Sequence, residues 1–180
     1  ERSGWLERVG RGAYVRAGEV PSWQGALYAI QSQLAVAVHV GGKSALELKG
    51  FEHFVAAGSG APLELFSETH RRLPAWFTQY KWTRSMLLHH GTLFGGDNTI
   101  AMSKHEVGAF ALDVSSPERA MLETLSLVPK KQGFEEARLL MEGLTGLRPK
   151  LVQKLLEKCG SIKTKRLFLY LAEHCNHPWV

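Results

Sequence analysis

The stretch from residue 4 to residue 16 constrains the fold of this chain more than any other. Two short runs rich in aromatic and β-branched residues, 5–9 and 13–16, flank the tripeptide Gly10-Arg11-Gly12. Glycine takes the positive φ angle that a tight chain reversal needs at no steric cost. The stretch therefore predicts a β-hairpin over residues 5–16.

Arginine dominates the charge of this predicted hairpin. Arg8, Arg11 and Arg16 line its strands and tip, and Glu7 is the one acid among residues 4–16. A guanidinium group meets phosphate oxygens directly, so a ribbon of this kind suits the backbone or the minor groove of DNA. An ordinary surface hairpin with solvated arginines explains the same residues, and it stays open as the alternative.

Composition restricts the class of protein and its partners. A chain of 180 residues with 44% hydrophobic and 22% charged residues is typical of a soluble globular protein with one large or two small domains. Its apolar runs are all shorter than the roughly 18–20 residues of a membrane span, so we expect no membrane partner. Cys159 and Cys175 are expected to be reduced thiols of a cytoplasmic protein. The net charge of +5 favours polyanionic partners.

Helical and strand patterns alternate after the hairpin. Ser22 is expected to cap a helix over residues 23–34, with a short apolar strand at 35–40 and a helix at about 43–50 after it. The next segment, 56–62, is small and interrupted by Gly and Pro, which predicts a domain boundary. We therefore expect one domain over residues 1–57 and a second over residues 58–180.

The second region predicts a mixed α/β domain that ends in a helical bundle, which makes the whole chain α+β. An aromatic segment with Trp76, Phe77 and Trp82 is expected to pack into the core, although a base-stacking platform is the alternative. Ser116 is expected to cap a helix that Pro129 ends. The other expected elements are strands at 63–66, 85–89 and 107–114 and helices at 134–143, 149–158 and 163–174.

A second concentration of positive charge lies near the C-terminal end. In the helix predicted at 149–158, Lys150, Lys154 and Lys158 follow one another at four-residue spacing opposite an apolar face. Such a face is either solvated or a surface for a partner. The helices at 149–158 and 163–174 are also compatible with a helix-turn-helix.

The motifs that suggest catalysis or metal binding are incomplete. Gly42-Lys43-Ser44 ends like a phosphate-binding loop, but Ala37 stands where that loop has its first glycine. Glu47-Leu48-Lys49 is typical of metal-dependent nucleases, yet no second carboxylate accompanies it in sequence. Cys159, His174, Cys175 and His177 lack the spacing of zinc modules. We expect no active site, no cofactor and no metal ion.

The order of several segments carries a family resemblance. The segments are SGWLER at 3–8, GRGAY at 10–14, WQGALYA at 23–29, VHVGGKSALEL at 38–48, RLPAWF at 72–77 and SSPERA at 115–120. In this order they resemble the AbiEi antitoxins, the DNA-binding repressors of type IV toxin–antitoxin operons. The resemblance covers most of the chain.

This resemblance implies a fold and a set of DNA contacts. The N-terminal domain, 1–57, would be the remainder of a winged helix-turn-helix with the hairpin as its wing, most of the helix-turn-helix lying upstream of residue 1. The C-terminal antitoxin domain, 58–180, would stop short of the family's last β segment. The implied DNA-binding residues are Arg8, Arg11, Tyr14 and Arg16.

The resemblance also implies a function. The chain would repress its own operon by binding double-stranded DNA at operator inverted repeats, without being an enzyme. It would counteract a nucleotidyltransferase-like toxin without forming a stable complex with it. A non-catalytic protein-interaction domain and a nucleic-acid-processing enzyme are the alternatives. The candidate antitoxin surface comprises Lys150, Lys154, Lys158, Lys163, Lys165 and Arg166.

Overall fold

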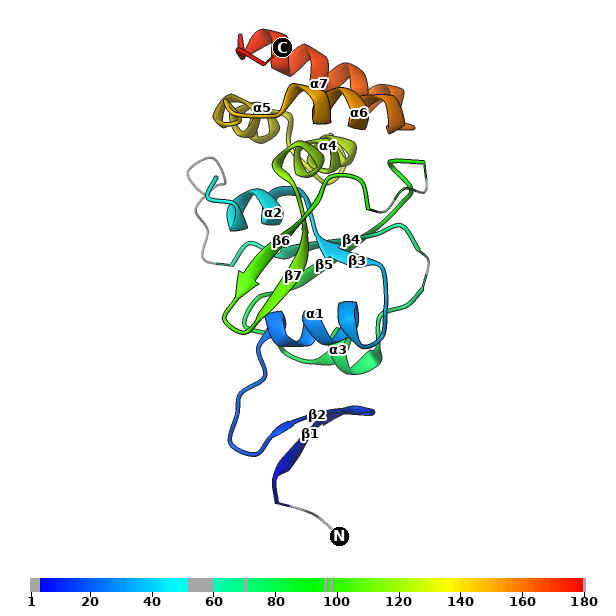
Figure 1. Cartoon of the computed structure of the whole chain (residues 1–180), viewed down its shortest axis with the longest axis vertical. Coiled ribbons are helices and arrows are strands. Elements are labelled where there is room, and N and C mark those ends of the chain that lie inside the picture. The colour runs from blue at the N-terminus through cyan, green and yellow to red at the C-terminus, as the bar shows by residue number, and fades with distance from the viewer. Residues whose placement is uncertain (1–3, 52–59, 70, 96, 98, 180) are drawn as a thin grey trace.

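The structure is a computed structural model that describes residues 4–51, 60–69, 71–95, 97 and 99–179. Its elements are stacked in layers along the longest axis, from a two-stranded hairpin at the N-terminal end to a group of helices at the C-terminal end (Figure 1). The domain boundary predicted at residue 57 lies outside the described residues.

The predicted hairpin is present. Strand β1, Leu6–Gly10, pairs antiparallel with β2, Ala13–Arg16, and Gly12 at the turn has a φ of 84°. This positive φ is the backbone conformation for which glycine is preferred.

A five-stranded mixed sheet forms the middle of the molecule, in the order β5-β4-β3-β7-β6. The central strand β3 runs antiparallel to β4 and parallel to β7. Because β3 and the following helix precede residue 57, the sheet is built from both sides of the predicted boundary. The division into domains 1–57 and 58–180 stays a prediction. The strands are β3, Val38–Val40, β4, Leu63–Ser67, β5, Met86–His90, β6, Met102–Val107, and β7, Phe110–Ser115.

The strand predicted at 107–114 is wrong in its extent. Residue Val107 ends β6, and Gly108, with a φ of 56°, lies in the tight turn that leads into β7. Sequence reasoning missed β6, because Met102–Val107 is largely polar and occupies the sheet edge, where only one side of a strand is paired.

Helices cover both faces of the sheet (Figure 1). Ser22 caps the first helix as predicted, since its Oγ accepts from the N–H of Gly25 at 3.1 Å. The helices predicted at 134–143 and 149–158 are confirmed, and the chain is α+β. The elements are α1, Trp23–Ser32, and α3, Ala75–Gln79, on one face, α2, Gly42–Leu48, and α4, Pro117–Leu127, on the other, and then α5, Phe134–Gly143, α6, Pro149–Lys158, and α7, Ile162–His174.

Two hydrophobic cores lie on the two sides of the sheet. One joins α1, α3 and the sheet around Leu27, Leu65 and Phe77, and Trp76 and Trp82 pack against it. The predicted core role of the aromatic segment is therefore confirmed. The other joins α2 and α4 to the C-terminal helices, and includes Leu125 and Phe168. No helix in the described part of the chain is both long and apolar enough to span a membrane.

Candidate nucleic-acid interface

The hairpin stands at one end of the molecule (Figure 1). Its strand β1 contacts helix α3 at Gly10. A Cβ atom placed on Gly10 would lie 2.5 Å from the Cβ of Trp76 in α3. Any side chain at residue 10 would therefore push β1 away from α3. Glycine at this position lets the ribbon rest on α3 while its strands extend outward.

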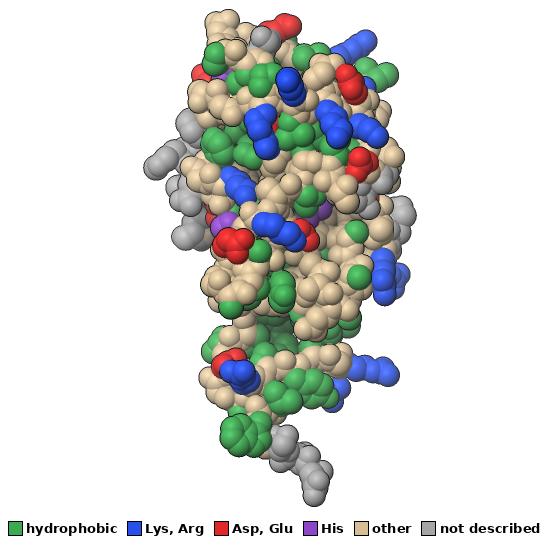
Figure 2. Space-filling model, viewed as in Figure 1, with side chains coloured by type: hydrophobic (Ala, Val, Ile, Leu, Met, Phe, Trp, Pro, Cys, Tyr) green, Lys and Arg blue, Asp and Glu red, His purple; other side chains and the backbone are tan. Residues whose placement is uncertain are grey.

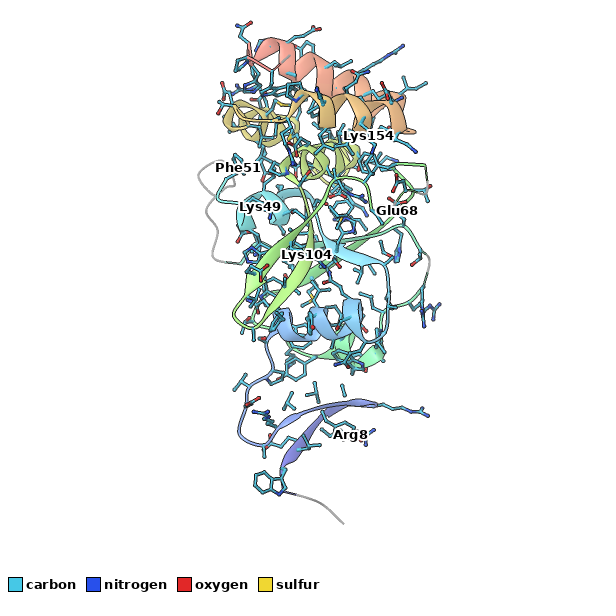
Figure 3. The ribbon with its side chains drawn as sticks, viewed as in Figure 1. Arg8, Lys49, Phe51, Glu68, Lys104 and Lys154 are labelled. Carbon is cyan, nitrogen blue, oxygen red and sulfur yellow. The ribbon has the colours of Figure 1, made fainter. Side chains whose placement is uncertain are left out.

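The strand register gathers the predicted DNA-binding residues on one face of the ribbon. Leu6 pairs with Arg16, and Arg8 pairs with Tyr14. Directly opposed residues of an antiparallel pair point to the same face, so Arg8, Tyr14 and Arg16 share a surface. All are exposed, and Arg11 lies exposed at the tip. Figure 3 places Arg8 on this ribbon, away from the sheet and the C-terminal helices.

Few acidic groups neutralise these arginines. The Nε of Arg8 donates to the carbonyl of Gly10 at 3.2 Å, and Arg16 lies 4.0 Å from the carboxylate of Glu19. That ion pair is largely exposed, and exposed pairs contribute at most about 1 kcal/mol. Arg11 has no hydrogen-bond or ion-pair partner among the described residues. The guanidinium groups are thus available to an external anion.

Large apolar side chains are exposed on the same ribbon. Trp5 is 81% exposed and Tyr14 is 61% exposed. Figure 2 shows apolar and basic side chains side by side at this end of the molecule. A surface with this mixture can contact both the sugar edges and the phosphates of a duplex.

The candidate antitoxin surface lies at the opposite end of the molecule (Figure 3). Lys150, Lys154 and Lys158 are all exposed along α6, and Arg166 is exposed on α7. Lys165 is half-buried. Lys163 differs, because its Nζ donates to the carbonyls of Ser126 and Val128 and so completes the C-terminal end of α4.

A buried polar cluster centred on Glu123 was not predicted from the sequence. One carboxylate oxygen, Oε1, accepts from His39 Nε2 at 2.9 Å and from Arg119 Nε at 2.8 Å. The other, Oε2, accepts from Ser115 Oγ at 2.8 Å and from the N–H of Gly42 at 3.0 Å. Burial by itself raises the pKa of Glu123, but the charges and hydrogen bonds of His39 and Arg119 outweigh it and lower this pKa to about 2.

Glu118, in the segment SSPERA, joins α4 to the start of α6. Its carboxylate accepts from the backbone N–H of Arg148 at 3.1 Å and from the Arg148 guanidinium at 2.9 and 3.0 Å. Burial by itself raises the pKa of Glu118, but the hydrogen bonds from Arg148 have the larger effect and lower this pKa to about 2. This contact therefore links α4 to the start of α6 in the helical bundle.

The motifs that suggest catalysis have intramolecular partners. The N-terminus of α2, where a phosphate would lie in a nucleotide-binding loop, is occupied by Glu123 and by Glu64, which accepts from the N–H of Lys43 at 3.1 Å. Glu47 forms a two-point ion pair with Arg84. Within the described ranges, no group of three or more His, Cys, Asp or Glu side chains is placed to hold a metal ion.

Sequence comparison matches the chain to two family models. Residues 61–180 match the model described as "Transcriptional regulator, AbiEi antitoxin, Type IV TA system". Residues 1–57 match the model of the AbiEi antitoxin N-terminal domain of such regulators. No curated protein sequence matches the chain significantly.

Among solved structures, the RV2827C protein from Mycobacterium tuberculosis is similar in fold. The two share 16% sequence identity with a TM-score of 0.62 over 98% of this chain. The chain spans 63% of the length of that protein. At this level of identity the likeness is one of fold alone.

Proposed function

Since this chain belongs to the AbiEi antitoxin family of type IV toxin–antitoxin transcriptional regulators, we propose that it binds double-stranded DNA and represses its own operon. The β1–β2 hairpin acts as the wing of a winged helix-turn-helix and contacts operator inverted repeats from Arg8, Arg11, Tyr14 and Arg16. A regulator of this kind acts in the cytoplasm. It works by occupying DNA, not by chemical conversion.

The observation that carries this proposal is the shared outward face of the ribbon. Arg8 and Arg16 flank Tyr14 on one surface, and Arg11 extends from the tip. Phosphate contacts fix the register of a protein on a duplex without reading sequence, which is the role of a wing beside a reading helix.

The salt dependence of DNA binding tests the wing. The full natural chain is titrated by fluorescence anisotropy against a duplex carrying the inverted repeats of its operon, at several salt concentrations. Each phosphate contact contributes about 0.9 to the slope of log K against log salt. The double variant Arg8→Ala with Arg11→Ala should weaken binding to all sequences and reduce the slope by roughly 2.

The matched control is Arg138→Ala, because Arg138 is paired with Glu135 and Glu142 in α5, far from the ribbon. It should leave the slope unchanged. A double variant with the wild-type slope would contradict the assignment of the hairpin as the wing.

We propose that the antitoxin activity uses the exposed basic residues of α6. This activity counteracts a nucleotidyltransferase-like toxin without a stable complex. The support is the continuous row of Lys150, Lys154 and Lys158, with Lys163, Lys165 and Arg166 of α7 nearby in sequence. Lys163 contributes mainly through its bonds to the end of α4.

Growth rescue tests this surface. Cells expressing the toxin of the same operon are complemented with the wild type, with the triple variant Lys150→Ala, Lys154→Ala and Lys158→Ala, or with the control Lys81→Ala, which changes an exposed lysine elsewhere. We expect the triple variant alone to lose rescue. Co-elution of toxin and chain on a sizing column would contradict action without a stable complex.

A further inference from the structure

A cavity of about 200 Å³ lies beside the buried cluster, at the end of β4 and beneath α4. Figure 3 shows Glu68 at this level, between the sheet and the C-terminal helices. Neither the wing nor the basic face of α6 uses it. Its wall includes His39, Phe66, Glu68, His89, Phe94 and Arg119.

Two side chains present polar atoms there that have no hydrogen-bond partner among the described residues. Glu68 binds Arg119 Nη2 through Oε1 at 3.2 Å, but its Oε2 is buried and makes no hydrogen bond. Within the described ranges, both ring nitrogens of His89 also lack a hydrogen bond, and a carboxylate oxygen of Glu64 lies 3.9 Å from its Nε2. The side chains of Glu68 and His89 are only 6% and 7% exposed. Buried polar atoms of this kind are normally satisfied, so they indicate a bound group.

The charge of the surroundings favours a cation. The side chains of Glu68 and Glu123 are buried beside Arg119, whose guanidinium is already shared between them, and the buried Glu64 lies 3.9 Å from His89. Burial raises the pKa of Glu68 more than the charges of Arg119 and His39 lower it, so the negative charge of this carboxylate is incompletely compensated. A second positive group would supply that compensation.

The aromatic side chains favour a flat group. The rings of Phe66 and His89 lie 4.8 Å apart and Phe66 is half-buried. The cavity already contains one such contact within the chain: the guanidinium carbon of Arg119 lies over the Phe94 ring, 4.8 Å from its centroid. Flat guanidinium groups combine such ring contacts with in-plane hydrogen bonds to carboxylates.

We infer that this cavity binds the guanidinium group of a ligand, which donates to Glu68 Oε2 and to a ring nitrogen of His89 and lies against Phe66. A neighbouring cavity of about 470 Å³ shares His39, Glu68 and Arg119 with it and also contains Asp113. The rest of the ligand has room there. The source is either a free guanidine compound or an arginine side chain of a partner.

Calorimetric titration of the full chain tests the site with agmatine, a free guanidine compound. We expect saturable binding of one agmatine per chain. Urea, which has the shape of guanidinium without its charge, and putrescine, which has the amines without the planar group, should bind at least about tenfold more weakly.

Two variants identify the contacts. Glu68→Gln keeps an oxygen for Arg119 but removes the charge, and should weaken agmatine binding at least about tenfold. His89→Phe keeps a ring against Phe66 and should weaken it as well. Glu106→Gln, an exposed carboxylate on the edge strand β6, is the control and should bind as the wild type does. A thermal melt verifies that each variant is folded.

The source of the guanidinium is decided with N-acetyl-arginine methylamide. If it binds as agmatine does, the site fits an arginine of a partner protein; if only agmatine binds, the ligand is a free small molecule. Absence of saturable agmatine binding, or equal binding by Glu68→Gln, would overturn the inference. Because the wing variant Arg8→Ala with Arg11→Ala should bind agmatine normally, failure here is distinct from failure of DNA binding.

Discussion

The backbone N–H of Gly42 donates to Glu123 Oε2 at 3.0 Å, so a carboxylate from α4 lies at the first turn of α2. A helix N-terminus favours negative charge, because its N–H groups point outward and its dipole is positive there. The adjoining glycines permit this approach, since a Cβ on Gly41 would collide with the same carboxylate. The two glycines therefore let the N-terminus of α2 bind a carboxylate of the same chain, that of Glu123.

Glu123→Gln is expected to destabilise the fold severely. The amide would leave the charge of Arg119, which is 1% exposed, without its closest counter-ion. Breaking a buried pair in this way costs about 3–5 kcal/mol. Urea denaturation measures the loss. The control Glu135→Gln alters a carboxylate that is 75% exposed and should cost less than about 1 kcal/mol. A similar small loss for both variants would show that the cluster is not important for stability.

Stability is expected to fall in acid. The folded-state pKa of both Glu118 and Glu123 is lowered to about 2 from an ordinary 4.5. Their contribution to the free energy of unfolding is present above pH 4.5 and is lost as the pH falls towards 2. Glu68 acts in the opposite sense, since its raised pKa favours the folded protonated form. Unfolding at a series of pH values should show a decline below pH 4.5, and a flat profile over that window would disprove it.

Gly42→Ala is expected to lower the free energy of unfolding more than a glycine-to-alanine substitution at an open position does. Gly42 has a φ of 53°, and a Cβ there would collide with Glu64 Oε2. Backbone strain of this type alone costs about 1–2 kcal/mol, and the displaced carboxylate adds to it. Gly146→Ala is the control, because in the described part of the chain no heavy atom beyond its sequence neighbours lies within 4 Å of its Cβ position. Comparable midpoints for the two variants in chemical denaturation would refute the expectation.

Gly10→Ala is expected to loosen the ribbon without unfolding the protein. The new Cβ would lie 2.5 Å from the Cβ of Trp76, so β1 has to move away from α3. Hydrogen exchange should accelerate at the amides of residues 6–16, while protection in the sheet is retained. Gly4→Ala, in open space, should leave exchange unchanged. Unaltered exchange in Gly10→Ala would mean that the contact with α3 does not hold the ribbon.

Local patterns predicted much of the fold. The apolar stripes of α5 and α6, with Pro149 in the first turn of α6, define these helices in sequence, and the glycines at 10 and 12 define the hairpin. Strand β6 could not be found in this way, because Lys104 and Glu106 alternate with half-buried residues that are mostly not apolar. Its strand conformation depends on pairing with β7, which is a tertiary effect.

The buried cluster was harder to predict, since His39, Gly42, Ser115 and Glu123 come from distant parts of the sequence. One signal was nevertheless present. The apolar residues of α4 point in several directions around the helix, and Ala120, Met121, Leu122 and Leu125 are all fully buried. A helix of that kind is surrounded by protein, so Arg119 and Glu123 within it had to be paired internally. Their four-residue spacing already indicated the pair.

The central position of β3 has a consequence for dissecting this protein. Excision at residue 60 would produce a C-terminal half that lacks the strand between β4 and β7. Both of these strands would then present open backbone donors and acceptors, which recruit other chains and lead to aggregation. The same cut would remove Gly42 and His39 from Glu123. We therefore expect the C-terminal half to need the N-terminal half for its solubility, even though separate family models match them.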